Sequence, residues 1–308
     1  MSEPPARPSK AVTPLSTPAV DTGAHAALRF PLKPDALTAL VRTALDEDAA
    51  HNDLTSIATV HASARARAVI VARQPGVICG VPLALEAVRQ LEAHGTIRID
   101  HVDGARVAPG TIILYLSGKA RGLLAAERVA LNFMQRLSGV ATLTAKFVEA
   151  VQGTRAKILD TRKTTPGWRL LEKYAVRCGG GTNHRMNLGD AVLIKDNHLA
   201  AVSGDVAAAV QRARAIAPAG ARVEVECDHL EQAEAAVAAG ADIVLLDNMT
   251  LDELREAVDA IAGRALVEAS GGVRLDTVRA IADTGVDWIS VGAITHSAPA
   301  LDLALDFD

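Results

Sequence analysis

The hydrophobic pattern of the first half of the chain changes from helical to strand-like and back to helical. Leu37, Leu40, Val41 and Leu45 recur at spacings of three and four, which predicts an amphipathic helix early in the chain. Short apolar runs separated by Gly and Pro then predict β-strands at 66–72, 76–80, 95–101 and 110–118. A long helical stretch covers about 120–151, with a break expected near Ser138 and Gly139. We therefore expect a small α+β region here.

A regular alternation of strands and helices begins at residue 157. Six short apolar runs lie at 157–161, 191–196, 222–227, 242–248, 265–271 and 287–293. Helical segments separate most of them, and the last four runs begin about 20 residues apart. Nearly continuous apolar strands between helices are typical of a parallel sheet covered by helices. Six such units favour a closed or nearly closed α/β barrel, and a doubly wound open sheet is the structural alternative.

Each of these runs ends in a polar or small residue. In order, these ends are Asp160 with Thr161, Lys195, Glu226, Asp247, Ser270 and Gly292. In an α/β barrel the carboxyl ends of the strands face one mouth, where active sites form. The alternative is that these residues only cap the following helices. Thr250 with Glu253 and Asp228 with Glu231 already form capping patterns, which leaves Asp247 and Glu226 available for a site.

Composition and charge exclude several classes of protein. The chain has 308 residues, 49% of them hydrophobic, and no apolar run approaches the roughly 20 residues that span a bilayer. A net charge of -4 argues against a general nucleic-acid binder. The three cysteines are far apart and have no metal-ligand spacing, which favours ordinary thiols in the cytoplasm. Residues 1–28 are rich in Pro and lack the apolar core of a secretory signal, so we expect a disordered tail.

Cations gather at residues 159–198 of this acidic chain. The stretch holds seven Lys and Arg residues, together with His184 and His198. Such a group suits a ligand with several negative charges, because guanidinium groups pair with carboxylates and phosphates. Glycine-rich turns at 269–272 and 290–293 offer backbone N–H groups to a phosphate, and the two carboxylates Glu226 and Asp247 suit sugar hydroxyls or Mg²⁺. The pattern indicates an enzyme that acts on a phosphorylated sugar by positioning and electrostatics.

Two features of this stretch have simpler structural interpretations. Arg169, Lys173 and Arg177 lie four residues apart, so they could form one solvated face of a helix. Trp168 is expected to pack against the core rather than to stack on a ligand.

Nine motifs in order along the chain resemble the quinolinate phosphoribosyltransferase family. They are ERVALNFMQRLSGVAT, DTRKTTPG, RLLEKYAV, GGGTNHR, LIKDNH, VEVE, LLDN, EASGG and TGVDWISVGAITHS, between residues 127 and 297. EDAAHNDLTS is a weaker match from residue 47, with Ala50 and Asn52 where glycines are usual. Trp168 likewise replaces a smaller aliphatic residue. These departures concern loops and substrate entry and touch no proposed catalytic charge.

The resemblance implies an activity, a fold and an assembly. Such enzymes convert quinolinate and phosphoribosyl pyrophosphate to nicotinate mononucleotide, pyrophosphate and carbon dioxide with Mg²⁺, a step of NAD biosynthesis. The implied fold is an N-terminal α/β sandwich over 29–138, completed by 297–308, beside an incomplete α/β barrel over 139–296. The implied assembly is a cytoplasmic homodimer or higher oligomer whose sites are shared between subunits.

The resemblance also implies roles for individual residues. Lys195, Glu226 and Asp247 would be catalytic, with Glu226 and Asp247 holding ribose hydroxyls and the metal, directly or through the substrate. Arg128 would reach in from the partner subunit. The quinolinate pocket and its surroundings would comprise Thr161, Arg162, Lys163, His184 and Arg185. Backbone groups of Ser270, Gly271, Gly272, Val291, Gly292 and Ala293 would bind phosphate.

Three other functions fit parts of the pattern. A Schiff-base lyase could use Lys195, since barrel aldolases place a lysine in this way. A related phosphoribosyltransferase could act on nicotinate or another acid. A non-catalytic relative could bind phosphorylated ligands as a sensor, although the charged strand ends are all present.

Overall fold

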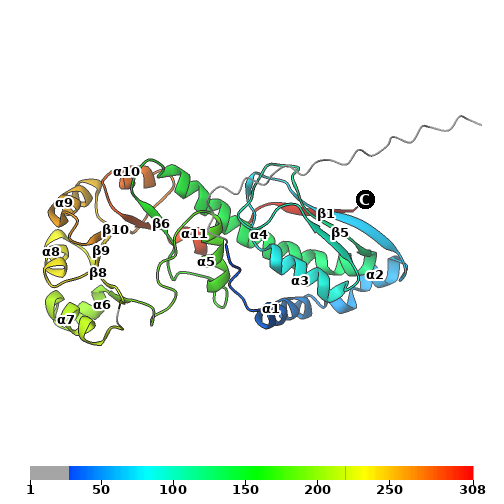
Figure 1. The fold of residues 1–308 in the computed structure, drawn as a ribbon, viewed down its shortest axis with the longest axis horizontal. Coiled ribbons are helices and arrows are strands. Elements are labelled where there is room, and N and C mark those ends of the chain that lie inside the picture. Colours follow the sequence, from blue (N-terminus) through cyan, green and yellow to red (C-terminus); the bar gives the residue numbers. More distant parts are fainter. Residues whose placement is uncertain (1–27, 219, 308) are drawn as a thin grey trace, which may run out of the picture.

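The computed structural model describes residues 28–218 and 220–307, so the predicted tail lies outside the described residues up to residue 27. The molecule is elongated, with the parallel strands and their helices at one end and an antiparallel sheet with its helices at the other (Figure 1). The long helix α4 (Ala120–Ala150) runs between the two regions.

The N-terminal region is built on a four-stranded antiparallel sheet. Its order is β12 (Leu303–Phe307), β1 (Arg65–Ala72), β5 (Ile112–Lys119) and β3 (Thr96–Ile99). Two short strands, β2 (Gly76–Val77) and β4 (Arg106–Val107), pair separately. The helical elements besides α4 are α1 (Pro34–Glu47), η1 (Ala50–Asn52), α2 (Leu54–Thr59) and α3 (Val81–Leu91). The last strand of the chain pairs with the first, since Leu305 lies opposite Ile70. Residues near the C-terminus therefore complete a sheet formed by the N-terminal region.

Helix α4 is continuous where a break was expected. It runs through Ser138 and Gly139, both of which are fully buried or nearly so. A Cβ atom on Gly139 would lie 2.1 Å from the carbonyl oxygen of Pro299. Ser138 Oγ accepts a hydrogen bond of 2.9 Å from the backbone N–H of Cys79. The glycine thus marks a close approach of two chain segments, and the predicted break is wrong.

Six parallel strands form the second sheet. Its order is β6 (Lys157–Leu159), β11 (Trp288–Ser290), β10 (Leu266–Ser270), β9 (Ile243–Asp247), β8 (Val223–Cys227) and β7 (Val192–Ile194). The helices of this region are α5 (Arg169–Cys178), α6 (Asp196–Ala200), α7 (Val206–Ile216), α8 (Leu230–Ala238), α9 (Leu251–Ile261), α10 (Val278–Ala282) and α11 (Ala293–His296). Several of these helices, including α8 and α9, lie along the outside of the strands in Figure 1.

The strand order identifies an incomplete barrel. The five strands from β7 to β11 neighbour one another in chain order, and β6 then pairs with β11. A doubly wound sheet would reverse its order partway across, so that alternative is wrong. The strands β6 and β7 do not pair, and Thr182 instead forms an isolated bridge to Leu159 beside this gap. The barrel is therefore open at one seam, as the family resemblance implied.

The two predicted helix caps have different outcomes. Thr250 and Glu253 form the reciprocal capping box at the start of α9. At α8 the N-cap is His229, and the backbone N–H of Asp228 donates instead to Gln232 Oε1 at 2.7 Å. The pairing of Asp228 with Glu231 as a cap is therefore wrong, because the helix begins one residue later than that cap requires.

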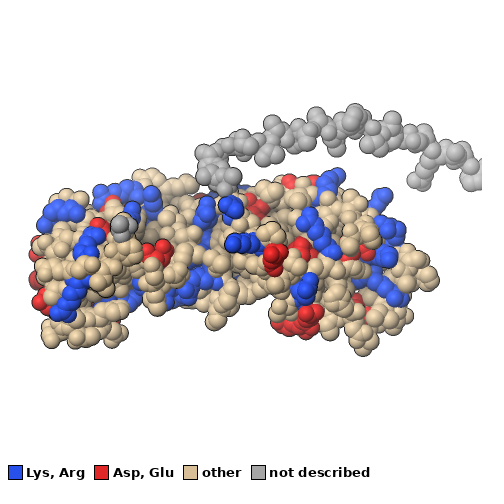
Figure 2. All heavy atoms as spheres, turned by 60° about the horizontal axis from the view of Figure 1, so that its bottom comes forward, with Lys and Arg blue, Asp and Glu red and all other residues tan. Residues whose placement is uncertain are grey.

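Two further features of the described residues are the character of their helices and the distribution of charge on one face. Among the described residues, no helix combines the length and apolar character needed to cross a bilayer. On the face shown in Figure 2, Lys and Arg side chains are interspersed with Asp and Glu over both regions of the molecule. This face carries no continuous basic stripe of the kind that follows a nucleic-acid backbone.

Candidate active site

A pocket of about 350 Å³ lies at the carboxyl ends of the parallel strands. It brings together nine of the residues predicted from the sequence: Thr161, Arg162, Lys163, His184, Arg185, Lys195, Glu226, Asp247 and Ser270. Four further side chains complete its lining: Leu193, Leu245, Glu268 and Ser290. The mouth predicted from the polar strand ends is thus a real concave site.

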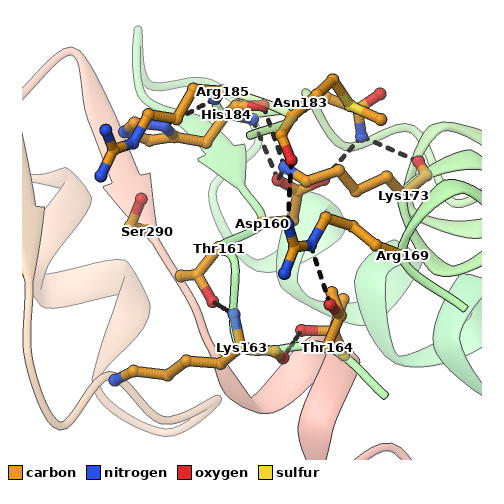
Figure 3. Close-up of polar contacts among 12 residues, drawn as sticks. Asp160, Thr161, Lys163, Thr164, Arg169, Lys173, Asn183, His184, Arg185 and Ser290 are labelled. Atoms are coloured by element: carbon orange, nitrogen blue, oxygen red, sulfur yellow. Dashed lines mark hydrogen bonds and ion pairs between the residues drawn. The ribbon is translucent and has the colours of Figure 1, made fainter. Parts of the chain in front are cut away.

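Three cations of the pocket have no carboxylate partner among residues 28–218 and 220–307. Arg162 Nε is buried and has no acceptor in this part of the chain. Within the same part of the chain, the guanidinium of Arg185 donates only to the carbonyl oxygen of Ala191, at 3.2 Å. Burial and the neighbouring charge of Arg162 lower the pKa of Arg185, although a guanidinium stays charged at any physiological pH. Lys163 extends into the same space as Arg185, on the side of Thr161 and Ser290 (Figure 3). Cations held close together without counter-charges form a site for an anion.

Lys195 differs from these cations because it already has a carboxylate partner. Its Nζ donates to Glu226 Oε2 across the mouth of the pocket, from the end of β7 to β8. Nearby, Asp247 Oδ2 accepts a hydrogen bond of 2.7 Å from Asn248 Nδ2. Asn248 has a φ of 57°, and Gly271, at φ 93°, lies so close that a Cβ atom there would be 2.2 Å from Asn248 Oδ1. Glycine at 271 therefore leaves room for the residue that orients Asp247.

His184 contacts two buried carboxylates inside the barrel. Its Nε2 lies 3.1 Å from Glu224 Oε2 and 3.6 Å from Glu268 Oε2. Its Nδ1 accepts a hydrogen bond of 2.7 Å from the backbone N–H of Arg185. Nδ1 therefore carries no proton in this arrangement, and Nε2 is the N–H that points at the carboxylates. Both ring nitrogens are occupied by protein groups, so His184 supports the pocket wall in this state rather than offering a free nitrogen to a ligand.

The carboxylates change the protonation of this cluster. Burial, followed by the charge of Glu224, raises the pKa of Glu268 to about 8. Glu268 is fully buried, Ser290 Oγ donates to its Oε1 at 2.5 Å, and its Oε2 has no hydrogen-bond partner in the described part of the chain. Burial alone would lower the pKa of His184, but the hydrogen bond to Glu224 and the charges of Glu268 and Glu224 outweigh it and raise that pKa. Glu268 therefore retains its proton to a higher pH than a solvent-exposed glutamate does.

The cluster of His184, Glu224 and Glu268 has three ligand atoms within 4.8 Å of one another, which is close enough to hold a metal ion. A metal on Nε2 would require the ring proton to move to Nδ1, where it would oppose the N–H of Arg185. The observed hydrogen bonds therefore fit a shared proton better than a metal. Glu226 and Asp247 are the better pair for a hard cation, because both present carboxylate oxygens at the mouth.

Six predicted binding residues do not line the pocket itself. Gly271, Gly272, Val291, Gly292 and Ala293 follow the ends of β10 and β11, and Arg128 lies on α4. A Cβ atom on Gly292 would be 3.2 Å from His296 Nε2 and 3.3 Å from Lys163 Cδ, so these three residues lie together beside the mouth. Val291 is buried, and Arg128 is exposed. Sequence reasoning did not single out His296, Glu224 or Glu268.

The alternative interpretation of the α5 cations as one solvated face is wrong for two of the three. Lys173 is only 1% exposed and pairs with Asp160, which is itself fully buried. Arg169 is partly buried and donates to Thr164 Oγ1 at 3.1 Å and to the carbonyl oxygen of Met186 at 3.3 Å. Arg177 alone is exposed. Trp168 packs as predicted, with its ring stacked on Phe133 at a centroid distance of 5.2 Å.

A larger hollow, of about 530 Å³, lies at the opposite ends of the strands. Its charged side chains are already engaged. Asp287 accepts from the backbone N–H of Val267 and lies 3.3 Å from Arg155, while Asp242 pairs with Arg214. Because its charges are satisfied within the protein, this hollow is a poorer candidate for chemistry than the smaller pocket at the mouth.

Comparison with known proteins agrees with the motifs. The family model described as "Quinolinate phosphoribosyl transferase, C-terminal domain" matches residues 140–306, and the corresponding N-terminal model matches 53–138. The chain is 47% identical over 278 residues to a carboxylating nicotinate-nucleotide pyrophosphorylase of Mycobacterium leprae, covering 88% of this chain and 97% of that protein. It is 42% identical over 260 residues to a probable enzyme of the same name in Bacillus subtilis, covering 84% of this chain and 89% of that one.

A solved structure supports the same assignment. The nicotinate-nucleotide pyrophosphorylase of Francisella tularensis superposes with a TM-score of 0.85 at 42% identity, covering 91% of this chain and 99% of that one. The resemblance inferred from the motifs is therefore confirmed, and so is the prediction of a phosphoribosyltransferase. The two matched domain models and the nearly full-length relatives establish that the chain belongs to the quinolinate phosphoribosyltransferase family.

Proposed function

We propose that this protein transfers the phosphoribosyl group of phosphoribosyl pyrophosphate to quinolinate and releases carbon dioxide, giving nicotinate mononucleotide and pyrophosphate. The observation that supports this substrate best is the pair Arg162 and Arg185. Both guanidinium groups border one pocket, and neither is paired with a carboxylate in the part of the chain that the structure describes. Quinolinate carries two carboxylates on adjacent ring carbons, so two guanidinium groups match its charge.

The reaction requires one bond to form as another breaks. The pyridine nitrogen of quinolinate forms a bond to C1 of the ribose, while the bond from C1 to the pyrophosphate oxygen breaks and its electrons leave with pyrophosphate. In our proposal Lys195, Glu226 and Asp247 lie on the ribose side, where the carboxylates bind hydroxyl groups and stabilise positive charge on the sugar. The 2-carboxylate then leaves as carbon dioxide, and its carbon takes up a proton.

The phosphate of the donor is assigned to the turns after β10 and β11. Ser270 lines the pocket, and Gly271, Gly272, Val291, Gly292 and Ala293 continue these two turns. Lys163 and His296 flank Gly292, where the lysine would add positive charge and the imidazole a hydrogen-bonding group. Thr161 Oγ1 accepts from the backbone N–H of Lys163 at 3.1 Å and holds the turn that carries this lysine.

Glu226 and Asp247 are the residues that would hold Mg²⁺, directly or through the substrate. Mg²⁺ prefers carboxylate and phosphate oxygens, and both side chains face the pocket where the pyrophosphate would lie. When bound, the ion would neutralise charge on the departing pyrophosphate.

We also propose that the active protein is a homodimer in which Arg128 enters the site of the partner subunit. Arg128 is exposed on α4 and does not line the pocket of its own chain. A cytoplasmic location fits the three cysteines, all of which are free thiols.

A Schiff-base lyase is less consistent with the site. A nucleophilic lysine is usually activated by an apolar pocket or a second cation, whereas Lys195 contacts Glu226.

The deciding experiment is an assay of the purified protein with phosphoribosyl pyrophosphate, Mg²⁺ and either quinolinate or nicotinate. Pyrophosphate and nicotinate mononucleotide are followed together. We expect product from quinolinate alone, because nicotinate supplies only one carboxylate to two arginines. Product from nicotinate at a comparable rate would instead assign the protein to the related activity. No product from either, with folded protein, would contradict both.

A further inference from the structure

The segment that carries His184 and Arg185 lies at the open seam of the barrel. Residues 179–186 lead from α5 toward β7, on the side where β6 and β7 do not pair. Within the described residues, the bridge between Leu159 and Thr182 is its only backbone pairing with a strand, and the His184 side chain also contacts Glu224 on β8 and Glu268 on β10. An unpaired loop would be free to move, yet its two basic residues must stay in place if they are to bind a small diacid. Other contacts must therefore hold it.

Buried charges supply these contacts. Asp160 Oδ1 accepts a hydrogen bond of 3.0 Å from the backbone N–H of His184, and Lys173 Nζ donates to the carbonyl oxygen of the same residue at 2.9 Å. Both backbone groups of His184 are therefore held by side chains, one from the residue that follows β6 and one from α5. Asp160 and Lys173 also pair directly with each other (Figure 3).

Asn183 joins the same network. Its Nδ2 donates to Asp160 Oδ2 at 2.6 Å and to the backbone carbonyl of Lys173 at 2.8 Å. Figure 3 shows Lys173 and Asn183 on the side of α5, whereas the Arg185 and Lys163 side chains extend the other way, into the pocket. Asp160 and Lys173 do not line the pocket, so they do not contact a ligand there.

Retaining two buried charges is costly unless each is paired and hydrogen-bonded. Burial raises the pKa of Asp160 despite the opposing charge of Lys173, and burial lowers the pKa of Lys173 despite Asp160. Two apolar side chains would fill this space at lower cost. Two apolar side chains could not, however, form hydrogen bonds to both the backbone N–H and the carbonyl oxygen of His184.

We infer that Lys173 and Asp160 are positioning residues that hold the backbone of His184 and so set the affinity of the enzyme for its acid substrate. They replace the strand pairing that is missing between β6 and β7. The donor is expected to be much less affected, because its proposed ligands lie at the carboxyl ends of β7 to β11, in the turns after β10 and β11, and on Lys163. This inference rests on the proposed function.

The test replaces both charges together, with Asp160→Asn and Lys173→Met in one chain. Asn keeps an acceptor for the His184 N–H, and Met removes the donor to the His184 carbonyl without leaving an unpaired buried charge. We expect KM for quinolinate to rise about tenfold or more, as for loss of a charge-assisted hydrogen bond. We expect KM for phosphoribosyl pyrophosphate to stay within about twofold, and calorimetry to show the same loss of quinolinate affinity.

Tyr174→Phe is the matched control. Tyr174 follows Lys173 on α5, is buried, and donates to Asp103 Oδ2 at 2.9 Å, away from the pocket. It should lower the melting temperature without separating the two KM values. Equal weakening of both substrates in the double variant would overturn the inference, because it would indicate a general structural role. An unchanged quinolinate affinity would overturn it as well.

Asn183→Ala is a milder variant, available if the double variant does not fold. It removes one side chain from the network and leaves the ion pair in place, so we expect a rise of about threefold in KM for quinolinate alone. No rise in a folded protein would contradict the inference. The wild-type protein in the same assay tests the proposed function separately, since turnover of quinolinate by wild type does not depend on the outcome for either variant.

Discussion

At the scale of single residues, pairing distinguishes cations that hold the protein together from cations that are free for a ligand. Lys173 pairs with the buried Asp160 outside the pocket, whereas Arg162 and Arg185 have no carboxylate partner within residues 28–218 and 220–307. Sequence alone placed all three in one basic stretch. The packing around each side chain is what shows which cations are paired within the protein and which are available to bind an anion.

Glu268→Gln should reduce the dependence of stability on pH. The pKa of Glu268 is raised to about 8 from 4.5, so the native protein keeps this proton at pH values where the unfolded chain has lost it. Its contribution to stability is complete below about pH 4.5 and is lost as the pH rises through about 8. Glutamine resembles the protonated acid and cannot titrate. We expect the melting temperature to fall less between pH 5 and 9, in the range that this pKa shift defines, in the variant than in wild type.

Glu149→Gln is the control for that comparison. Glu149 is a half-exposed carboxylate on α4, paired at the surface with Arg106. Glu149→Gln removes a carboxylate outside the buried cluster, so a loss of slope that is seen only with Glu268→Gln is specific to the cluster. His184, whose pKa is also raised, will keep part of the slope in the Glu268 variant. Identical slopes for wild type and Glu268→Gln would show that this carboxyl does not retain its proton in the native state.

The polar ends of the strands could be predicted because the side chains of a strand alternate between two faces. The same rule contains the signal for two residues that were missed. Glu224 lies two positions before Glu226 on β8, and Glu268 lies two positions before Ser270 on β10, so each shares the interior face of its strand with the residue two positions later. Their contact with His184 could not be predicted, because it depends on how the loop at the seam is folded.

At the scale of elements, the spacing of apolar residues predicted the strands and helices of the barrel. The break predicted in α4 is wrong. Glycine was interpreted as a helix breaker, but Gly139 is needed for close packing against Pro299. That contact joins residues 160 positions apart (299 minus 139), and no local rule reports it. The missing pairing between β6 and β7 could not be predicted from the hydrophobic pattern either, since strand order depends on pairing between distant segments.

Gly139→Ala should therefore destabilise the protein even though alanine favours helices. The new methyl group would meet the Pro299 carbonyl at 2.1 Å, so α4 or the segment after α11 must shift. We expect a loss of about 1–3 kcal/mol in the free energy of unfolding. Denaturant unfolding measures it, with Lys146→Ala at an exposed position of the same helix as the control. A variant at least as stable as wild type would mean that helix propensity, and not this contact, decides position 139.

At the scale of the whole molecule, one chain contains the pocket but not every residue proposed for it. Arg128 lies on the exposed side of α4 and is absent from the lining of its own pocket. If it serves the partner subunit, Arg128→Ala and Lys195→Ala homodimers should each be nearly inactive. In a mixed dimer, the site with intact Lys195 lies in the Arg128→Ala chain and receives the intact Arg128 of its partner. One of its two sites is then complete.

Random mixing of the two inactive proteins should restore about a quarter of wild-type activity, because half of the dimers are mixed and each has one complete site. The control pairs Lys195→Ala with Lys163→Ala. Both of these residues line the pocket of their own chain, so no mixed dimer gains a complete site. Subunit exchange is verified by mass spectrometry with one isotope-labelled partner. Exchange without recovery of activity in the Arg128 mixture would remove Arg128 from the site, whereas recovery in that mixture alone would establish that the two subunits build each site together.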